Sequence, residues 1–430
     1  FLHIYCIIYV IVYIYVVTKY EGGFMKQRRM KRKAIKRAGT LFMALSLAVT
    51  SGVGVPLLDV RAEQSEAADE TVYKLDMDEN GYLTPAKESL DLENQVFSWD
   101  NASVYFVLTD RFKNSDTSND HSYGRGLKQD GTAVEGLNTA TNPGTFHGGD
   151  LGGLTEKVKD GYFTDLGVNA IWITAPYEQI HGYTSGNVRS NNAEVYPDEQ
   201  QQGFPYYSYH GYWTLDYTNI DANMGDEKDF EEFVDSCHER GIRVVMDVVM
   251  NHVGYTTMQD AVDYDFSSVL KSAVFNGTTY TWQQYYYGNA KSLFGGDPES
   301  LNFWNAESSE WAQKWWGAGF VRANYPGYDA AGGDDFHMSL CGLPDVITEA
   351  SAKEVATPPL LVNKWTKEER LSEEQGELDS FFASTGYKKQ PRYYIIKWLT
   401  DWVREYGVDG FRCDTAKHVD VDAWKDLKDE

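Results

Sequence analysis

Four short apolar runs, each followed by polar residues, constrain the fold of this chain more than any other feature of its sequence. They lie at 104–109, at 170–174, in RVVMDVVMNH from Arg243, and in VDGFRCD, which ends at Asp414. Continuous apolar runs are typical of strands buried on both faces, as in parallel sheets. Because helical patterns separate the runs, we expect right-handed βαβ units and an α/β fold. The length of 430 residues suits one large barrel with insertions.

The segments between these runs carry helical periodicity. Helices are predicted at three places: 151–168, 226–241 and 394–407. The second has an apolar stripe of four residues, Phe230, Phe233, Val234 and Cys237, and Gly241 ends it. The segment 182–205 is predicted to be a loop. A stretch rich in Tyr, Trp, Gly and Asn, about 253–345, is predicted to be an insertion on one βα loop.

Acidic residues stand at or near the ends of three predicted strands, namely Asp110, Asp247 and Asp414. In parallel barrels, chemistry is located at the carboxyl ends of the strands. Arg412 and Asp414 are two residues apart on a strand, so their side chains face the same side. A guanidinium group stabilises an ionised carboxylate, as a carboxylate nucleophile requires. The same spacing also fits a plain structural ion pair.

The run DVVMNH places Asp247 inside an apolar strand, with Asn251 and His252 at its exit. A buried carboxylate is costly unless it is hydrogen-bonded. Asn251 is a candidate oxygen ligand for a cation, and His252 is a candidate donor to a substrate hydroxyl. The alternative for each is a structural role, as a buried polar residue whose hydrogen bonds are satisfied within the core.

The composition narrows the classes of partner. A formal net charge of −25 argues against nucleic acid and suits calcium, which prefers carboxylate ligands. Aromatic residues make up 14% of the chain, enough for both a large core and sugar-binding surfaces. The four cysteines form neither a disulfide framework nor a zinc site and are predicted to be isolated thiols: Cys6, Cys237, Cys341 and Cys413.

The first 62 residues are predicted to lie outside the mature protein. Glu-Gly-Gly before Met25 can be encoded as a bacterial ribosome-binding sequence, so residues 1–24 are interpreted as an untranslated leader. Residues 25–62 have the basic, apolar and small-residue regions of a signal peptide, which predicts export to the periplasm or beyond. A membrane helix at 1–17 is the alternative. Residues 63–99 are predicted to be a linker or N-terminal extension.

Four segments together resemble the α-amylase family of retaining glycoside hydrolases. They are YHGYW (209–213), DVVMNH (247–252), GLPDV (342–346) and GFRCDTAKH (410–418), in the family's order and spacing. TDRFKNSDTSNDHSYGR and FHGGDLGGL resemble most the secreted and periplasmic bacterial members. The resemblance runs from about residue 104 to the end and implies a (β/α)8 TIM barrel with a calcium-binding insertion domain.

The resemblance also implies roles for single residues. Asp414 matches the nucleophile, Arg412 the group that holds it ionised, and Asp247 a supporting carboxylate. Tyr212 matches the ring that stacks under the sugar at the cleavage subsite, and Lys417 and His418 match groups toward the leaving group. The implied substrate-binding residues are His210, Tyr212, Trp213, His252, Lys417 and His418.

Two calcium sites are implied as well. The first comprises Asn251, Asp345 and the carbonyl of His418. The second comprises Asn114, Asp116, Asn119, Asp120, the carbonyl of Gly148, and Asp150. All are oxygen ligands, as calcium prefers. Ser115 stands where a glycine is common in the second site, and a solvated Asx-rich turn is the alternative there.

The domains implied are a first barrel part at 100–252, insertion domain B at 253–345, and a continued barrel at 346–430. The α-amylase family also has a general-acid Glu after the fifth barrel strand and a His-Asp pair after the seventh. Neither segment occurs in these 430 residues. We therefore expect a barrel truncated after about the fourth strand, an N-terminal fragment that is inactive alone.

The function implied is endo-hydrolysis of α-1,4-glucosidic bonds in starch, glycogen or maltodextrins by a monomer without a stable membrane partner. The alternatives are a glucan-chain transferase of the same family and a non-catalytic glucan-binding protein. DNA sequence beyond codon 430 would separate these possibilities.

Overall fold

The computed structural model describes residues 97–126, 144–186, 204–255, 257–265, 315–323 and 328–430, with five short strands elsewhere. The predicted signal peptide at 25–62 lies outside the described residues, as do most of the predicted leader and of the 63–99 segment. By contacts the chain divides into Lys26–Ser98 and a larger unit, Phe1–Met25 with Trp99–Glu430. In the smaller unit, β2 (Asp76–Met77) pairs with β3 (Leu83–Thr84).

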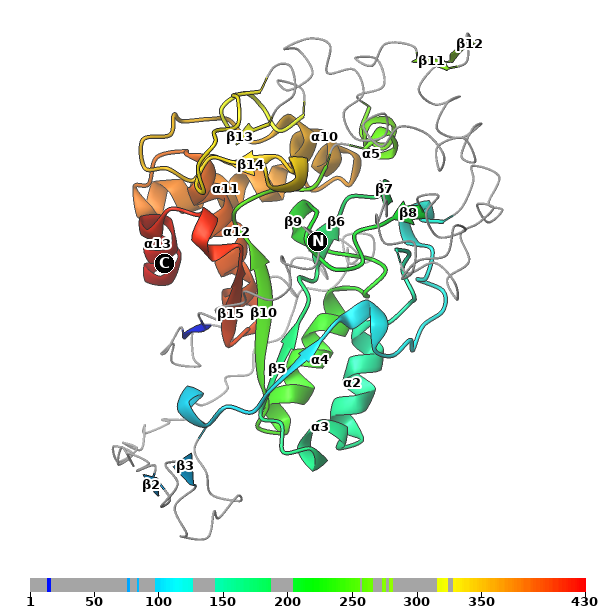
Figure 1. The fold of residues 1–430 in the computed structure, drawn as a ribbon, viewed down its shortest axis with the longest axis vertical. Helices are drawn as coiled ribbons and strands as arrows, with labels where there is room; N and C mark the ends of the chain where they lie inside the picture. Colours follow the sequence, from blue (N-terminus) through cyan, green and yellow to red (C-terminus); the bar gives the residue numbers. More distant parts are fainter. Residues whose placement is uncertain are drawn as a thin grey trace, which may run out of the picture. The chain divides into compact units, whose positions relative to one another are not determined.

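A parallel sheet forms the centre of the larger unit (Figure 1). Its neighbouring parallel strands are β4 (Val104–Val107), β5 (Ala170–Ile173), β10 (Arg243–Val249) and β15 (Gly410–Asp414). The four strands expected from the apolar runs are therefore confirmed, together with the α/β class. β1 (Ile14–Val16) pairs antiparallel with β15.

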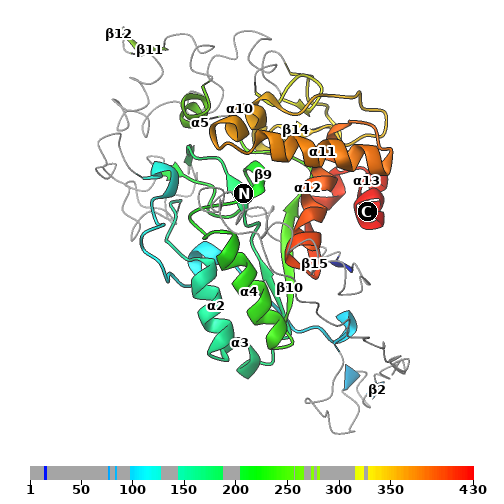
Figure 2. The same cartoon turned by 180° about the vertical axis from the view of Figure 1, so that it is seen from behind.

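Helices follow the strands as expected, with one difference. α2 (Leu151–Lys159) and α4 (Glu227–Glu239) lie side by side next to the sheet, and α12 (Pro391–Tyr406) precedes β15 (Figures 1 and 2). The prediction of one continuous helix at 151–168 is wrong. The chain breaks at Gly161, whose φ is +90°, before a short α3 (Tyr162–Asp165), because a left-handed residue cannot continue a right-handed helix.

The sequence pattern did not predict several other strands and helices. β6 (Tyr177–Gln179) pairs antiparallel with β9 (Thr214–Ile220). β7 (Thr184–Gly186) pairs with β8 (Phe204–Tyr206), so the ends of the predicted 182–205 loop are strands. The remaining elements are α5 (Met258–Asp263), β11 (Ala273–Phe275), β12 (Thr278–Tyr280), β13 (Val321–Arg322), β14 (Asp345–Val346), α10 (Pro359–Lys367), α11 (Leu371–Thr385) and α13 (Val421–Asp429), with short 3₁₀ turns between.

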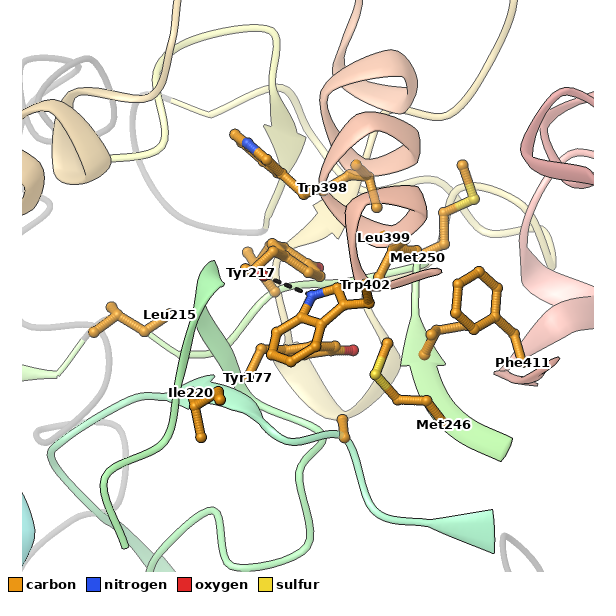
Figure 3. Close-up of a cluster of buried hydrophobic side chains, with 14 of the residues drawn as sticks. Tyr177, Leu215, Tyr217, Ile220, Met246, Met250, Trp398, Leu399, Trp402 and Phe411 are labelled. Carbon is orange, nitrogen blue, oxygen red and sulfur yellow. Dashed lines mark hydrogen bonds between the residues drawn. The ribbon is translucent and has the colours of Figure 1, made fainter. Parts of the chain in front are cut away.

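Part of the core lies between the outer face of the sheet and α12. Figure 3 shows Met246 of β10 and Phe411 of β15 in one cluster with Trp402 of α12 and the tyrosines of β6 and β9. The indole Nε1 of Trp402 donates to the carbonyl of Tyr217 at 3.0 Å. Because strand side chains alternate, the residues between these apolar positions point to the inner face.

A buried ionic cluster ties α10 to the β6–β9 pair. The side chain of Lys364 is fully buried, and its Nζ lies 2.8 Å from Glu178 Oε2 and 3.1 Å from Asp216 Oδ2. Trp365 Nε1 donates to Asp216 at 2.9 Å. Both carboxylates are also fully buried, so this cluster satisfies charges that would otherwise be very costly.

Cys237 is buried and Cys413 is partly buried, and both are free thiols, as expected. Cys6 and the side chain of Cys341 lie outside what the structure describes. Among the described residues, no helix combines the length and the apolar character needed to cross a bilayer.

Candidate active site

The end of β15 carries the pair expected to do the chemistry. Arg412 and Asp414 point to the same side of the strand, and Arg412 Nη1 donates to Asp414 Oδ1 at 2.7 Å. Their side chains are 12% and 15% exposed, so the carboxylate is shielded but accessible. Thr415, which follows, has a φ of +47°, a conformation that costs free energy in a residue other than glycine.

Asp247 of β10 binds the same guanidinium nitrogen as Asp414. Arg412 Nη1 donates to Asp247 Oδ1 at 3.1 Å and to Oδ2 at 3.2 Å. The hydroxyl of Tyr212 donates to Oδ2 at 3.2 Å. Asp247 is fully buried, and burial raises its pKa, with Asp414 acting in the same direction and Arg412 opposing it. The expectation that this strand carboxylate would be hydrogen-bonded is confirmed.

The segment YHGYW brings its rings together beside these carboxylates. His210 stacks on Tyr212, with ring centroids 5.2 Å apart, and meets Trp213 edge to face at 4.8 Å. Gly211 permits this tight turn because its φ is +85° and a Cβ there would press on Ala175. The three predicted substrate-binding residues of this segment therefore form one aromatic group.

His252 is bonded within the protein on both ring nitrogens. Its Nε2 donates to the Tyr212 carbonyl at 3.0 Å, and Asn251 Nδ2 donates to its Nδ1 at 3.2 Å. Burial lowers the pKa of His252, whereas the nearby Asp414 carboxylate acts to raise it. Its imidazole is therefore placed near the nucleophile candidate, but its donor serves the Tyr212 carbonyl in this structure. Donation to a substrate hydroxyl stays a prediction.

Lys417 and His418 lie in a 3₁₀ turn after β15 and contact the 328–340 loop. His418 Nδ1 donates to the Asp335 carbonyl at 2.6 Å, and the ring is 8% exposed. Lys417 is 71% exposed, with Nζ 3.7 Å from Asp335 Oδ2. Of this pair, only Lys417 offers a largely exposed side chain.

Two residues of the first predicted calcium site, Asn251 and Asp345, lie on neighbouring segments of the chain, whereas the part of the His418 carbonyl in the site stays a prediction. The amide N–H of Val346 donates to the Asn251 carbonyl at 2.8 Å, and His252 forms a β-bridge with Asp345. Asn251 Oδ1 is buried without a hydrogen-bond partner among the described residues. Asp345 is 2% exposed, and Arg322 Nη1 lies 2.9 Å from its carboxylate. Burial raises the pKa of Asp345 to about 7.

The second predicted site is only partly assembled. Asn114 Nδ2 donates to Asp120 Oδ1 at 2.7 Å, and a Cβ on Gly148 would collide with both side chains. Asn114 Oδ1 and Asn119 Oδ1 are buried and, in the described part of the chain, unpaired. Two of the six predicted ligands, Asn114 and Asn119, thus present buried acceptor oxygens that no described residue satisfies.

Asp116 and Asp150 have other partners in this loop. Asp116 Oδ1 accepts the Ser118 amide at 2.9 Å and is exposed. The Asp150 carboxylate accepts four hydrogen bonds, from the backbone amides of Ser115, Asp116 and Gly153 and from the Ser115 hydroxyl. As arranged here, Asp150 caps α2 and holds the loop, and it has no lone pair left for a cation. The expected ligand role of Asp150 stays a prediction.

The family described as the α-amylase catalytic domain matches residues 106–324. The chain belongs to the α-amylase family. Members of the family fold as (β/α)8 barrels, so the predicted fold class is confirmed at that level and agrees with the parallel sheet.

Two curated relatives illustrate the similarity. A periplasmic α-amylase of Escherichia coli (strain K12) is 42% identical over 353 residues, which cover 82% of this chain and 46% of that protein. A cyclomaltodextrin glucanotransferase of Bacillus sp. (strain 1011) is 30% identical over 183 residues, covering 42% of this chain and 22% of that protein. The chain thus spans less than half the length of these two relatives.

Solved structures also match. An α-amylase from Geobacillus thermoleovorans, complexed with acarbose, is 19% identical with a TM-score of 0.37, covering 77% of this chain and 44% of that chain. The cyclomaltodextrin glucanotransferase CldA is 22% identical with a TM-score of 0.39. The match covers 76% of this chain and 47% of that chain.

Several residues near the α-amylase family motifs escaped the sequence analysis. The guanidinium group of Arg111 lies 3.8 Å above the ring of Tyr209, and Tyr206 packs on Trp213 at 5.4 Å. Trp172 Nε1 donates to Asp247 at 3.2 Å. The run TDRF was a sequence signal for Arg111, and the aromatic spacing before YHGYW was one for Tyr206. Trp172 had no such signal, because its place in an apolar run is typical of a core residue.

One acidic group fits no prediction. Glu377, Asp401 and Glu405 converge on the surface of α11 and α12. Lys397 Nζ lies 2.8 Å from Glu377 and 2.5 Å from Asp401, so this group is an ion-pair cluster. The two predicted calcium sites differ from this group of three carboxylates, because their predicted ligands include amide and backbone carbonyl oxygens.

Proposed function

We propose that the protein carrying this chain is an α-amylase-type hydrolase of α-1,4-glucosidic bonds in starch, glycogen or maltodextrins. The observation that carries the proposal is the shared guanidinium group: Arg412 binds Asp247 and Asp414 at the carboxyl ends of adjacent parallel strands. Membership of the α-amylase family supports the substrate class.

In the proposed reaction, Asp414 attacks the anomeric carbon of a bound glucosyl unit with retention of configuration. Arg412 holds the carboxylate in its ionised form and fixes the attacking oxygen. The bond to the leaving oxygen breaks as the ester to Asp414 forms, and that oxygen takes a proton from a general acid. Water then hydrolyses the ester and gives its proton to the conjugate base, which restores the acid.

A retaining enzyme also needs an acid about 5–5.5 Å from the nucleophile. Asp247 does not suit that role, because Arg412, Trp172 and Tyr212 donate to its carboxylate. We therefore assign it the supporting role and assign the general acid to no described residue.

The substrate is proposed to lie against the aromatic group of the YHGYW segment. Tyr212 would stack under the sugar at the cleavage point, with His210 and Trp213 beside it. Lys417, exposed on the 3₁₀ turn after β15, would meet the sugar on the leaving side, with His418 next to it.

Calcium is proposed as the cofactor. The buried, unpaired acceptors among the described residues include the amide oxygens of Asn114, Asn119 and Asn251, three predicted ligands. Calcium, a hard cation that prefers oxygen, would satisfy Asn251 at the first site and Asn114 and Asn119 at the second. At the first site, Asn251 and Asp345 would hold the ion with the His418 carbonyl. Calcium bound there would join the 253–345 insertion to the barrel parts at 100–252 and 346–430.

Export is also proposed. The basic and apolar pattern at 25–62 and the 42% identity to a periplasmic α-amylase support it.

Trapping of the covalent intermediate tests the proposed function. The full-length gene product is incubated with a fluorinated α-maltosyl fluoride, and the modified peptide is identified by mass spectrometry. We expect the sugar on Asp414, and we expect Asp414→Asn to abolish labelling and lower starch hydrolysis about 10⁴-fold or more.

Asp409→Asn is the matched control. Asp409 stands at the opposite end of β15, where it binds His238 and the Val244 amide. This variant should keep labelling at Asp414. Turnover that survives Asp414→Asn, or a label on another residue, contradicts the assignment. Glucan binding without label or hydrolysis would favour a non-catalytic binding protein.

A glucan-chain transferase is the second candidate. The 30% identity to a cyclomaltodextrin glucanotransferase favours it. Chromatography of products from soluble starch separates the two, because a transferase yields cyclic or lengthened glucans and a hydrolase yields short linear ones.

A further inference from the structure

We propose that Trp172 is a positioning residue for the reaction proposed above. It holds Asp247 and Arg412 from beneath and so fixes the direction of Asp414. The inference rests on the proposed function and adds a residue to which neither the comparisons nor the sequence motifs give a role.

One row of side chains runs across the inner face of the sheet. Phe106 of β4 packs on Trp172 of β5 with ring centroids 4.3 Å apart. Trp172 Nε1 donates to Asp247 of β10 at 3.2 Å, and Asp247 binds Arg412 of β15. β4, β5 and β10 thus contribute one member each, and β15 contributes two, Arg412 and, at the end of the row, Asp414.

Trp172 makes two separate contacts with this row. Its N–H meets the Oδ2 atom of Asp247 that also accepts from Tyr212 and Arg412. Its ring lies under the guanidinium group of Arg412, with Cζ 5.1 Å from the ring centroid. A cation over an indole face is attracted to it, so the ring limits how far the guanidinium group can tilt.

These contacts matter because one atom serves both carboxylates. Arg412 Nη1 donates to Asp247 and to Asp414. If Asp247 loses its indole donor, a buried carboxylate oxygen is left with fewer partners, and its rotation moves Nη1. The attacking oxygen of Asp414 then shifts with it, and small shifts at a reacting atom reduce rate strongly.

The strand register separates this role from substrate contact. Trp172 is opposite Val245, whereas Asp414 is opposite Val249, four residues further along β10. Trp172 therefore lies deeper in the sheet than the nucleophile. A change at Trp172 should lower kcat while KM stays nearly constant, because binding of the sugar does not involve the indole.

Trp172→Phe in the full-length gene product tests the proposal, with hydrolysis of a maltooligosaccharide and labelling by the trapping reagent as readouts. Loss of one hydrogen bond to a charged group corresponds to a fall of about tenfold in kcat and in the labelling rate, with KM within about twofold of the wild-type value.

Trp365→Phe is the matched control, because it also removes an indole donor from a buried carboxylate, at 2.9 Å. We expect it to lower Tm and leave kcat unchanged. A Trp172→Phe protein that behaves like this control, or whose KM rises as kcat falls, overturns the proposal.

If Trp172→Phe does not fold, Phe106→Leu carries the test, because it keeps the indole and removes the ring packed on it. It should lower kcat at constant KM, and an unchanged kcat overturns the proposal. Failure of the proposed function is distinguishable: the wild-type protein would then show neither hydrolysis nor label at Asp414.

Discussion

At the scale of single residues, His181 joins two parts of the chain. Its Nε2 lies 2.8 Å from Glu178 Oε1 of β6, and its Nδ1 lies 3.6 Å from Asp260 and 3.5 Å from Asp263 of α5. The ring of Tyr123 stacks on it at 3.9 Å. Burial alone would lower the pKa of His181, but hydrogen bonds to Asp263 and Glu178 outweigh it and raise the pKa to about 9.

This shift predicts a loss of stability in alkali. A histidine whose pKa is raised by folding contributes its full stabilisation below its ordinary pKa of about 6.5 and loses it as the pH rises through about 9. The contribution is on the order of 3 kcal/mol. Urea unfolding between pH 6 and 10 should show the decline, and His181→Gln should flatten it. An equal slope in both proteins would contradict the assignment.

Residue spacing predicted local geometry well and distant partners poorly. The two-residue spacing of Arg412 and Asp414 was sufficient to place them on one side of a strand. The partner of Trp172 lies 75 residues away, and no local pattern signals such a contact. His252 shows the same limit, because its donor meets a carbonyl 40 residues away.

At the scale of elements, two glycines have opposite conformational requirements. Gly161 has a φ of +90°, and a Cβ there would make only ordinary contacts, so the strain of Gly161→Ala comes from the backbone. Gly376 lies exposed within α11, with nothing near its missing side chain.

Gly161→Ala should therefore destabilise the protein by about 1–2 kcal/mol. Gly376→Ala should stabilise it by about 0.5–1 kcal/mol, because alanine loses less conformational entropy in a helix. Urea unfolding of both variants measures the two effects, and the same sign in both would contradict this reading of the backbone.

Elements with a clear apolar pattern were predictable, and those with buried polar residues were not. The four sheet strands have continuous apolar runs. β9 was not predicted because its sequence, TLDYTNI, contains the polar residues Thr214 and Asp216. Both are buried in the structure, although polar residues are typical of exposed segments. α11 begins at Leu371, and its N-cap residue, Arg370, makes no side-chain capping hydrogen bond, so the helix offers no start signal of the usual kind.

At the scale of the whole molecule, the unpaired amide oxygens predict that calcium stabilises the fold. A cation that binds only the folded state adds about 2.7 kcal/mol at 100 times its Kd. EGTA should therefore lower Tm, and added Ca²⁺ should restore it.

Asn251→Ala should reduce the calcium-dependent rise in Tm. Asn363→Ala is the control, because Asn363 Nδ2 already donates to the Tyr264 carbonyl, and it should keep the full rise. A Tm that EGTA leaves unchanged would contradict both calcium sites. The predicted export signal at 25–62 and most of the interior of the predicted insertion lie outside the described residues, so both stay predictions.

The buried ionic cluster around Lys364 limits how this protein can be recombined with its relatives. Its charges come from β6, β9 and α10, which are far apart in sequence. Loss of one partner from a buried pair costs about 3–5 kcal/mol. A chimaera that takes α10 from another member without the matching β6–β9 pair would leave two buried carboxylates without their cation. Viable crossover points should therefore fall outside the span from Tyr177 to Lys367.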